Sequence, residues 1–350
     1  TLFVGECSHD KYRIVVSMDK ADSAGTKLYY SKNGGMYQGA GELNSQGWLQ
    51  IFLEPGTYTF STVPDSKAEE RYYCTFAVTD MPLNPLLRYA TRSGVCGAED
   101  GNLTWEISDS GMLSISGTGE MKDYSETSPA PWPKEEVTGV EIQAGVTSIG
   151  SYAFAGCYRM LSANISGTVD TINDHAFSGC LALSRADLSN DLVVLGPYAF
   201  ENCKKLESFD VGGCLLRLED GVFDGCTALK NVQLHEVMEI GAAAFRNCSS
   251  LQKLDAPCVL SIGDDAFNGC SALETITFAK QLSSFGVRSF YNCTSLTKIN
   301  IPDSVTVIPQ QAFYQCTSLN SIWLPDSVTT VEEEAFKLCR SAATIRLSNQ

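Results

Sequence analysis

The chain has 350 residues and a formal net charge of −16, with 41 Asp plus Glu against 25 Lys plus Arg. A chain this negative is a poor partner for the phosphate backbone of nucleic acid or for an anionic membrane, which leaves cationic or neutral partners. No run approaches the roughly 18 apolar residues of a transmembrane helix, so we expect no membrane insertion, and the start at Thr1 without a signal peptide is what a mature or trimmed secreted protein would have.

The residue pattern of 1–90 is typical of a small β domain. Runs rich in β-branched and aromatic residues predict strands at 12–18, 27–30, 48–53, 57–60 and 72–78. Strands at this spacing favour a β-sandwich-like N-terminal domain, whose function the residues do not indicate. Cys7 and Cys74 bracket the domain, and a disulfide between them is left open. The two prolines within residues 81–85 predict a linker out of it.

Residues 91–138 are expected to form a β-hairpin cap. Residues 103–107 and 112–116 alternate apolar and polar side chains on either side of a Gly-containing turn, which predicts a hairpin. A polar, Pro-rich segment at 125–133 follows and contains Trp132. Since the first unit of a repeat array has an open apolar face, this hairpin lies in the right place to cover it.

From residue 139 to 350 one motif recurs: a small residue, Phe, two variable residues and Cys. The nine Phe lie at positions 154, 177, 200, 223, 245, 267, 290, 313 and 336, so every step is 22 or 23 residues. A fixed period in this range is typical of a solenoid, in which each unit buries its apolar face against its neighbours. Residues 139–350 are therefore predicted to be one repeat domain of about nine units.

Apolar residues recur at fixed places in each unit. The residues eight and five before each Phe are apolar in all nine units, as at Val146 and Ile149, and the third residue after the Cys is Leu in seven. The pattern predicts an inward-facing strand, a turn, a second short extended piece and a tight helical turn that carries the Phe and Cys. The predicted fold class is mainly β: a leucine-rich-repeat solenoid with a parallel sheet and short helical turns, preceded by the β-sandwich-like domain.

Fourteen Cys would suggest a disulfide framework, but nine of them share one repeat position. Equivalent side chains on parallel strands roughly 4.8 Å apart point the same way, whereas a disulfide needs vectors that converge. These nine are therefore expected to be buried, unreactive thiols. The absence of any Cys-x-x-Cys pair argues against a zinc ribbon or a thioredoxin-like motif.

Two stretches resemble a known family. Residues 145–157 (GVTSIGSYAFAGC) and 301–308 (IPDSVTVI) look like the BspA-type leucine-rich repeats of bacterial surface proteins, also found in some mucosal protists. Phrases within residues 96–132 are similar to the segment that commonly precedes those repeats, so the resemblance covers about residues 92–350. It implies secreted or surface-displayed proteins that bind host matrix, host cells or other microbes, and it supplies no catalytic residues.

Residues for catalysis or metal binding are not evident. His9, His175 and His235 are the only three His, and none has a His or carboxylate partner at metal-ligand spacing. The H-E-x-x-H and G-x-S-x-G motifs are absent. We therefore expect no enzyme activity, no metal and no cofactor.

Because side chains alternate across a strand, the seventh residue after each Cys should face away from the core, on the solenoid's concave sheet. This column holds the candidate binding residues Asp187, Asp210, Gln233, Asp255, Asn300 and Trp323. Asp187 and Asp210 would stack one strand apart, and such like charges need compensation. One interpretation is a groove for a cationic or hydroxyl-rich ligand, with Trp323 as a stacking platform. The other is a solvated face on which Arg185 and Lys253 neutralise the aspartates.

Two functions are compatible with these features. The first is a monomeric, extracellular or cell-surface adhesion protein whose solenoid engages a protein or glycoprotein on a host or microbial surface. The alternative is a carbohydrate-binding or substrate-targeting module of a larger secreted system, with residues 1–90 as the sugar reader. Glycan binding by residues 1–90 alone would favour the alternative. A purely structural spacer would tolerate any substitution on the concave face.

Overall fold

The computed structural model of the chain divides into two compact units, Thr1–Thr91 and Arg92–Gln350. It describes strands β1 to β7 of the first unit and, in the second, residues 93–347 apart from Asp100, Ser189 and Ala343. For β1 to β7 and for β29 the description is of the backbone.

The first unit contains two antiparallel sheets. Their strands are β1 (Leu2–Ser8), β2 (Lys11–Ser17), β3 (Lys27–Lys32), β4 (Gln38–Glu42), β5 (Trp48–Leu53), β6 (Gly56–Ser61) and β7 (Tyr73–Val78). The sheets have the orders β1-β2-β5 and β4-β3-β6-β7. The five predicted strands correspond to β2, β3, β5, β6 and β7. Strand β4 escaped prediction because its sequence, QGAGE, has no β-branched or aromatic residue.

The predicted β-sandwich is not supported. The structure shows the two sheets, but the side chains that would pack between them lie outside the described residues. The side chains of Cys7 and Cys74 also lie outside the described residues, so a disulfide between them stays open. The predicted linker at 81–85 lies outside the described residues too and stays a prediction.

In the second unit, a hairpin extends the sheet of the solenoid. β9 (Leu103–Ile107) pairs antiparallel with β10 (Met112–Gly117), as predicted, and also with β8 (Ser93–Val95). β10 pairs in parallel with β12 (Gly139–Ile142), the strand before the first repeat. The hairpin therefore covers the open end that the first repeat would otherwise expose.

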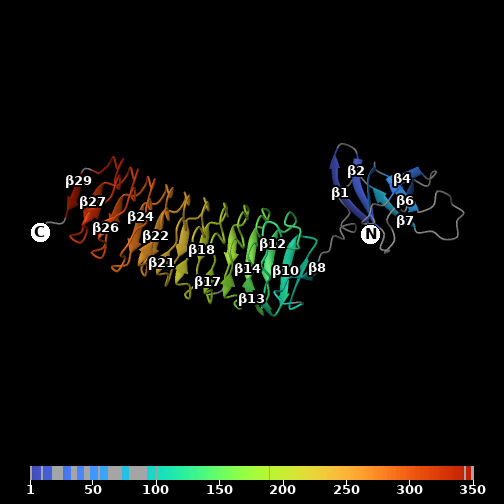
Figure 1. Ribbon diagram of the computed structural model, residues 1–350, viewed down its shortest axis with the longest axis horizontal. Coiled ribbons are helices and arrows are strands. Elements are labelled where there is room, and N and C mark those ends of the chain that lie inside the picture. Colours follow the sequence, from blue (N-terminus) through green and yellow to red (C-terminus); the bar gives the residue numbers. More distant parts are fainter. Residues whose placement is uncertain are drawn as a thin grey trace. The chain divides into compact units, whose positions relative to one another are not determined.

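The repeats stack their strands into a first ladder. After β12 it comprises β14 (Ser162–Ile165), β16 (Arg185–Asp187), β18 (Ser208–Asp210), β20 (Asn231–Gln233), β22 (Lys253–Ala256), β24 (Thr275–Phe278), β25 (Lys298–Asn300), β27 (Ser321–Leu324) and β29 (Thr344–Leu347). Figure 1 shows these strands following one another in chain order, from green to red. The paired strands are parallel, as predicted, but they fall into four hydrogen-bonded sheets rather than one.

A second ladder of shorter strands runs along another side of the solenoid. It comprises β13 (Val146–Ile149), β15 (Thr171–Ile172), β17 (Val194–Leu195), β19 (Arg217–Leu218), β21 (Glu239–Ile240), β23 (Ser261–Ile262), β26 (Val307–Ile308) and β28 (Thr330–Val331), and β11 (Gly119–Glu120) of the cap pairs with β13. These strands are the predicted second extended pieces, and they also pair in parallel.

The predicted helical turns are wrong. The segment that carries the Phe and Cys is a series of turns, and the residues that the structure describes contain no helix. Two positions in each repeat have positive φ, as at Tyr152 (54°) and Gly156 (74°), and left-handed residues so close together interrupt a right-handed helix. The backbone amides of this segment donate hydrogen bonds partly to the next repeat and partly within their own turn. Phe154 N donates to Ala176 O of the next repeat (2.7 Å), whereas Cys157 N donates to Phe154 O of its own turn (3.0 Å).

The inward side chains form one continuous core. The eight Phe from Phe154 to Phe313 are fully buried, and each stacks on the next with ring centroids 4.9 to 6.2 Å apart. The widest step, between Phe200 and Phe223, is filled edge-on by Phe209. Burying each ring stabilises the fold by roughly 1.5–3 kcal/mol relative to exposure, so this column fixes the architecture.

The nine repeat cysteines are free thiols, and all but the half-buried Cys339 are buried, as predicted. Each of the eight from Cys180 onward also donates a hydrogen bond to the carbonyl oxygen of the Phe one repeat earlier, as from Cys180 Sγ to Phe154 O (3.2 Å). Because that oxygen also accepts from the Cys157 amide, the thiol satisfies its second lone pair. Burial raises the pKa of Cys157 to about 12.

Alkylation rates should separate the cysteine ladder from an exposed thiol. The thiolate is the reactive form, so burial and a raised pKa both slow the reaction. In folded protein treated with iodoacetamide, peptide mapping should find exposed Cys214 modified well before Cys203 or Cys226, and in urea all three should react. Equal rates in the folded protein would show that the ladder is open to solvent.

Candidate functional site

The outward-facing side of the first ladder, called the strand face below, carries the six residues predicted to bind a ligand. They are Asp187, Asp210, Gln233, Asp255, Asn300 and Trp323, and all six are exposed. The intervening residues of the same strands are buried, such as Phe209 in β18 and Val232 in β20. Strand alternation thus places the six residues on one face, on strands β16 to β27.

Two aspartates of the strand face have a basic side chain as partner. Arg185 Nε donates a hydrogen bond to Asp187 Oδ1 (2.7 Å), which raises the pKa of Arg185. Asp210 Oδ1 lies 2.7 Å from His235 Nε2 and also accepts a hydrogen bond from Gly212 N (3.0 Å). Of the two aspartates that were expected to stack, Asp187 therefore has an ion-pair partner in Arg185, and Asp210 has a polar partner in the imidazole of His235.

Lateral neutralisation of the aspartates was predicted for Arg185 and Lys253. The structure has the Arg185 pair, but among the described residues no ion pair joins Lys253 to an aspartate. The sequence interpretation missed His235, which follows β20 and lies 25 residues after Asp210. The only sequence signal was that this separation is close to one repeat.

The remaining candidates extend the polar surface toward the C-terminal repeats. Thr277 Oγ1 of β24 donates a hydrogen bond to Asp255 Oδ1 of β22 (3.0 Å). Trp323 is 51% exposed and lies in register with Asn300 of β25. An indole ring half exposed among polar side chains can stack on a sugar ring, an aromatic group or a cation.

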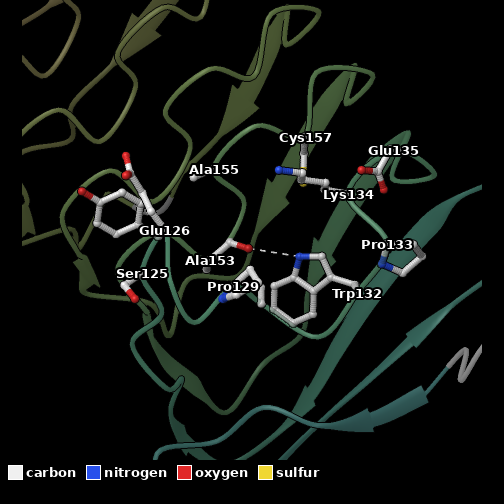
Figure 2. A pocket seen from close by; sticks show the side chains of 12 residues that line it. Ser125, Glu126, Pro129, Trp132, Pro133, Lys134, Glu135, Ala153, Ala155 and Cys157 are labelled. Carbon is white, nitrogen blue, oxygen red and sulfur yellow. Dashed lines mark hydrogen bonds between the residues drawn. The ribbon is translucent and has the colours of Figure 1, made fainter.

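A hollow of about 370 Å³ lies where the cap meets the first repeat. Figure 2 shows Ser125 and Glu126 on one side of the view and Trp132, Lys134 and Glu135 on the other, with Pro129 and Ala153 between them. The indole is 4% exposed, and its Nε1 donates a hydrogen bond to Ala153 O (3.0 Å). The volume suits a small ligand. A polar, Pro-rich segment was its only signal in the sequence.

Ion pairs in the turns between repeats were also missed. Arg246 donates hydrogen bonds to the buried Asp224, and Arg288 donates two to Asp265 (2.9 and 2.7 Å). Burial raises the pKa of Asp265, but the hydrogen bonds from Arg288 and Asn268 outweigh it and lower the pKa below its usual value. Because both Arg–Asp pairs join consecutive repeats, we assign them a structural role.

In the part of the chain that the structure describes, no group of three or more His, Cys, Asp or Glu is placed to hold a metal ion. Over the same residues, no helix is long and apolar enough to cross a bilayer.

Two parallel ladders, a stacked Phe column and a period of 22 or 23 residues define a β-solenoid of the leucine-rich-repeat class. A family model described as BspA type leucine rich repeat region, in six copies, matches residues 133–252 and 238–350. The chain belongs to this family.

Solved structures of bacterial leucine-rich-repeat proteins are similar to the chain. A protein from Bacteroides ovatus has a TM-score of 0.53 at 22% identity and covers 69% of this chain and 80% of its own. One from T. pallidum has a TM-score of 0.45 at 25% identity, covering 57% and 90%. A cell surface protein from Faecalibacterium prausnitzii has a TM-score of 0.37 at 20% identity, covering 73% and 96%. No curated protein sequence matches the chain.

Proposed function

We propose that the chain is a non-enzymatic binding protein, secreted or displayed at the cell surface, whose strand face engages a protein or glycoprotein on a host or microbial surface. Membership of the BspA-type family supports a role in binding rather than catalysis. Residues 1–90 form a separate N-terminal domain, residues 91–138 cap the solenoid, and residues 139–350 present the binding surface as a monomer.

The observation that carries the proposal is the exposure of Trp323 on an otherwise polar face. Burying an indole would stabilise the fold, yet this side chain is 51% exposed. Tryptophan is enriched among the residues that dominate binding energy at interfaces. The carboxylates of Asp187, Asp210 and Asp255 on the same face favour a cationic or hydroxyl-rich ligand.

Adhesion of purified protein to immobilised host-surface extract tests the strand face. Replacing Trp323 with Ala, or Asp187 and Asp210 together with Ala, should weaken adhesion about tenfold or more, because each change removes a contact group at the interface. Both variants should keep the wild-type circular dichroism spectrum. Exposed ion pairs contribute little to stability, so the double aspartate variant should also keep a melting temperature close to that of the wild type.

Two variants away from the strand face serve as matched controls. Asp303→Ala removes an exposed carboxylate from a turn, and Tyr158→Ala removes an exposed aromatic ring from the turn after Cys157. Both should adhere like the wild type. If all the folded strand-face variants also adhere like the wild type, the strand face is not the binding surface.

A further inference from the structure

A row of exposed apolar side chains lies at the start of four strands of the second ladder, each side chain belonging to the residue just before its strand. It consists of the residues seven before the Phe in four consecutive repeats: Val193, Leu216, Met238 and Leu260, each 39% to 55% exposed. At the same position the other repeats carry Thr147, Asp170, Ser283, Thr306 and Thr329. The apolar residues are thus confined to the middle of the solenoid, and polar residues end the row on both sides.

The backbone holds these side chains in a regular line. Met238 N donates to Leu216 O (2.8 Å), and Leu260 N donates to Met238 O (2.7 Å), so the row follows the hydrogen-bonded ladder. Leu216, Met238 and Leu260 are therefore one strand spacing apart, about 4.8 Å, and Val193 occupies the same position in the preceding repeat. Contiguous exposed apolar groups rimmed by polar residues mark interaction surfaces.

An acidic hollow of about 380 Å³ lies directly beside the row. Its lining includes Arg217, Glu239 and Ser261, each adjacent in sequence to a member of the row, and its charged groups are Asp220, Glu239, Asp264 and Arg217. The lining thus holds three carboxylates and one guanidinium, and the guanidinium of Arg217 is itself paired with Glu219 and Glu239. The hollow therefore attracts positive charge.

The spacing of the row and the negative charge of the hollow distinguish between possible binding partners. Successive turns of an α-helix bring side chains of one face to about 5.4 Å intervals, so four turns remain close to register with the row. Residues on one face of an extended strand recur at about 6.7 Å and fall out of register within two steps. A second copy of this chain would bring acidic hollows together, whereas a basic partner would neutralise them.

We propose that the row and the acidic hollow form a docking site for a cationic amphipathic helix of a partner protein. Leucine-like side chains on one face of that helix contact Val193, Leu216, Met238 and Leu260, and lysines or arginines on its flank lie against Asp220 and Asp264. This site is separate from the strand face, so its failure would leave the proposed adhesive function intact.

Fluorescence anisotropy with three labelled peptides and the full chain tests the proposal. The first peptide has about four helical turns with leucines on one face and lysines elsewhere. The second has the same composition with the leucines dispersed, and the third has glutamates in place of the lysines. The first should bind, and the other two should bind at least about tenfold more weakly.

Variants locate the binding. Leu216→Ser combined with Met238→Ser should weaken the first peptide about tenfold, because both substitutions remove contact area. Thr306→Ser, at the same repeat position outside the row, should leave its affinity unchanged. Asp220→Asn with Asp264→Asn keeps the oxygens that accept the Ala242 and Val287 amide hydrogen bonds but removes the charge, so it should lower both affinity and salt dependence.

Three results would each overturn the proposal. Equal binding of the dispersed-leucine peptide would mean that only charge attracts the helix, and unchanged affinity in the Leu216→Ser, Met238→Ser variant would place binding elsewhere. Sedimentation that shows a wild-type dimer, made monomeric by the same two substitutions, would assign the row to a second copy of the chain.

Discussion

Replacing Phe245 with Ala is expected to lower the free energy of unfolding by about 3–5 kcal/mol. The side chain is fully buried and stacks between Phe223 and Phe267 at 5.5 and 5.2 Å. Truncation therefore removes both stacking partners' contacts and leaves a cavity in the middle of the column. Urea unfolding followed by circular dichroism measures the change.

The position of the removed ring determines how many repeats are destabilised. Repeats interact only with their neighbours, so hydrogen exchange should quicken in the repeats on both sides of Phe245. Phe336→Ala is the matched comparison, because Phe336 is only partly buried at the end of the array and stacks on Phe313 at 5.2 Å. Phe336→Ala should lower the free energy of unfolding clearly less than Phe245→Ala does. A Phe245→Ala protein as stable as the wild type would contradict an inward Phe column.

Replacing Trp132 with Ala should cost about 3–5 kcal/mol in the same assay. The indole stacks on Phe154 at 5.3 Å and meets Trp105 and Tyr124 edge-on at 6.0 and 5.7 Å. Its loss exposes the first Phe of the column and leaves Ala153 O without its indole donor. Limited proteolysis should then cut the cap before it cuts the central repeats.

A milder substitution separates packing from hydrogen bonding at this position. Trp132→Phe keeps an aromatic ring against Phe154 but loses the N–H group, so it should retain much of the stability that Ala loses. Trp323→Ala, which removes a half-exposed indole, should lower the free energy of unfolding much less than Trp132→Ala does. Wild-type stability and proteolysis of Trp132→Ala would mean that the cap does not protect the solenoid core.

The repeat period predicted most of the solenoid because each inward column carries one type of side chain. The strands, the buried Phe and Cys and the hairpin before the first repeat all follow from apolar spacing. The conformation of the turns was not predicted, although the sequence contains a signal for it. The residue before the Cys is Gly or Asn in seven repeats, such as Gly156 and Asn202, and these residues tolerate the positive φ that the structure has there.

The candidate site could be predicted only in part. Alternation along a strand is a local rule, so it placed Asp187, Asp210 and Trp323 on the outward face. Which side chain pairs with which depends on the turns between strands, and for that reason the contact of His235 with Asp210 was missed. The apolar row was not predicted because each repeat contributes only one of its residues. These residues come together only when the repeats stack.

We propose that ligand binds on the strand face, and hydroxyl-radical footprinting of Trp323 can check this claim. Its indole is exposed and readily oxidised, and Met238 on the second ladder reports the other face in the same mass spectrum. With the host-surface ligand bound, oxidation of Trp323 should fall several-fold relative to the free protein. Equal oxidation of Trp323 in the bound and free protein would contradict the claim.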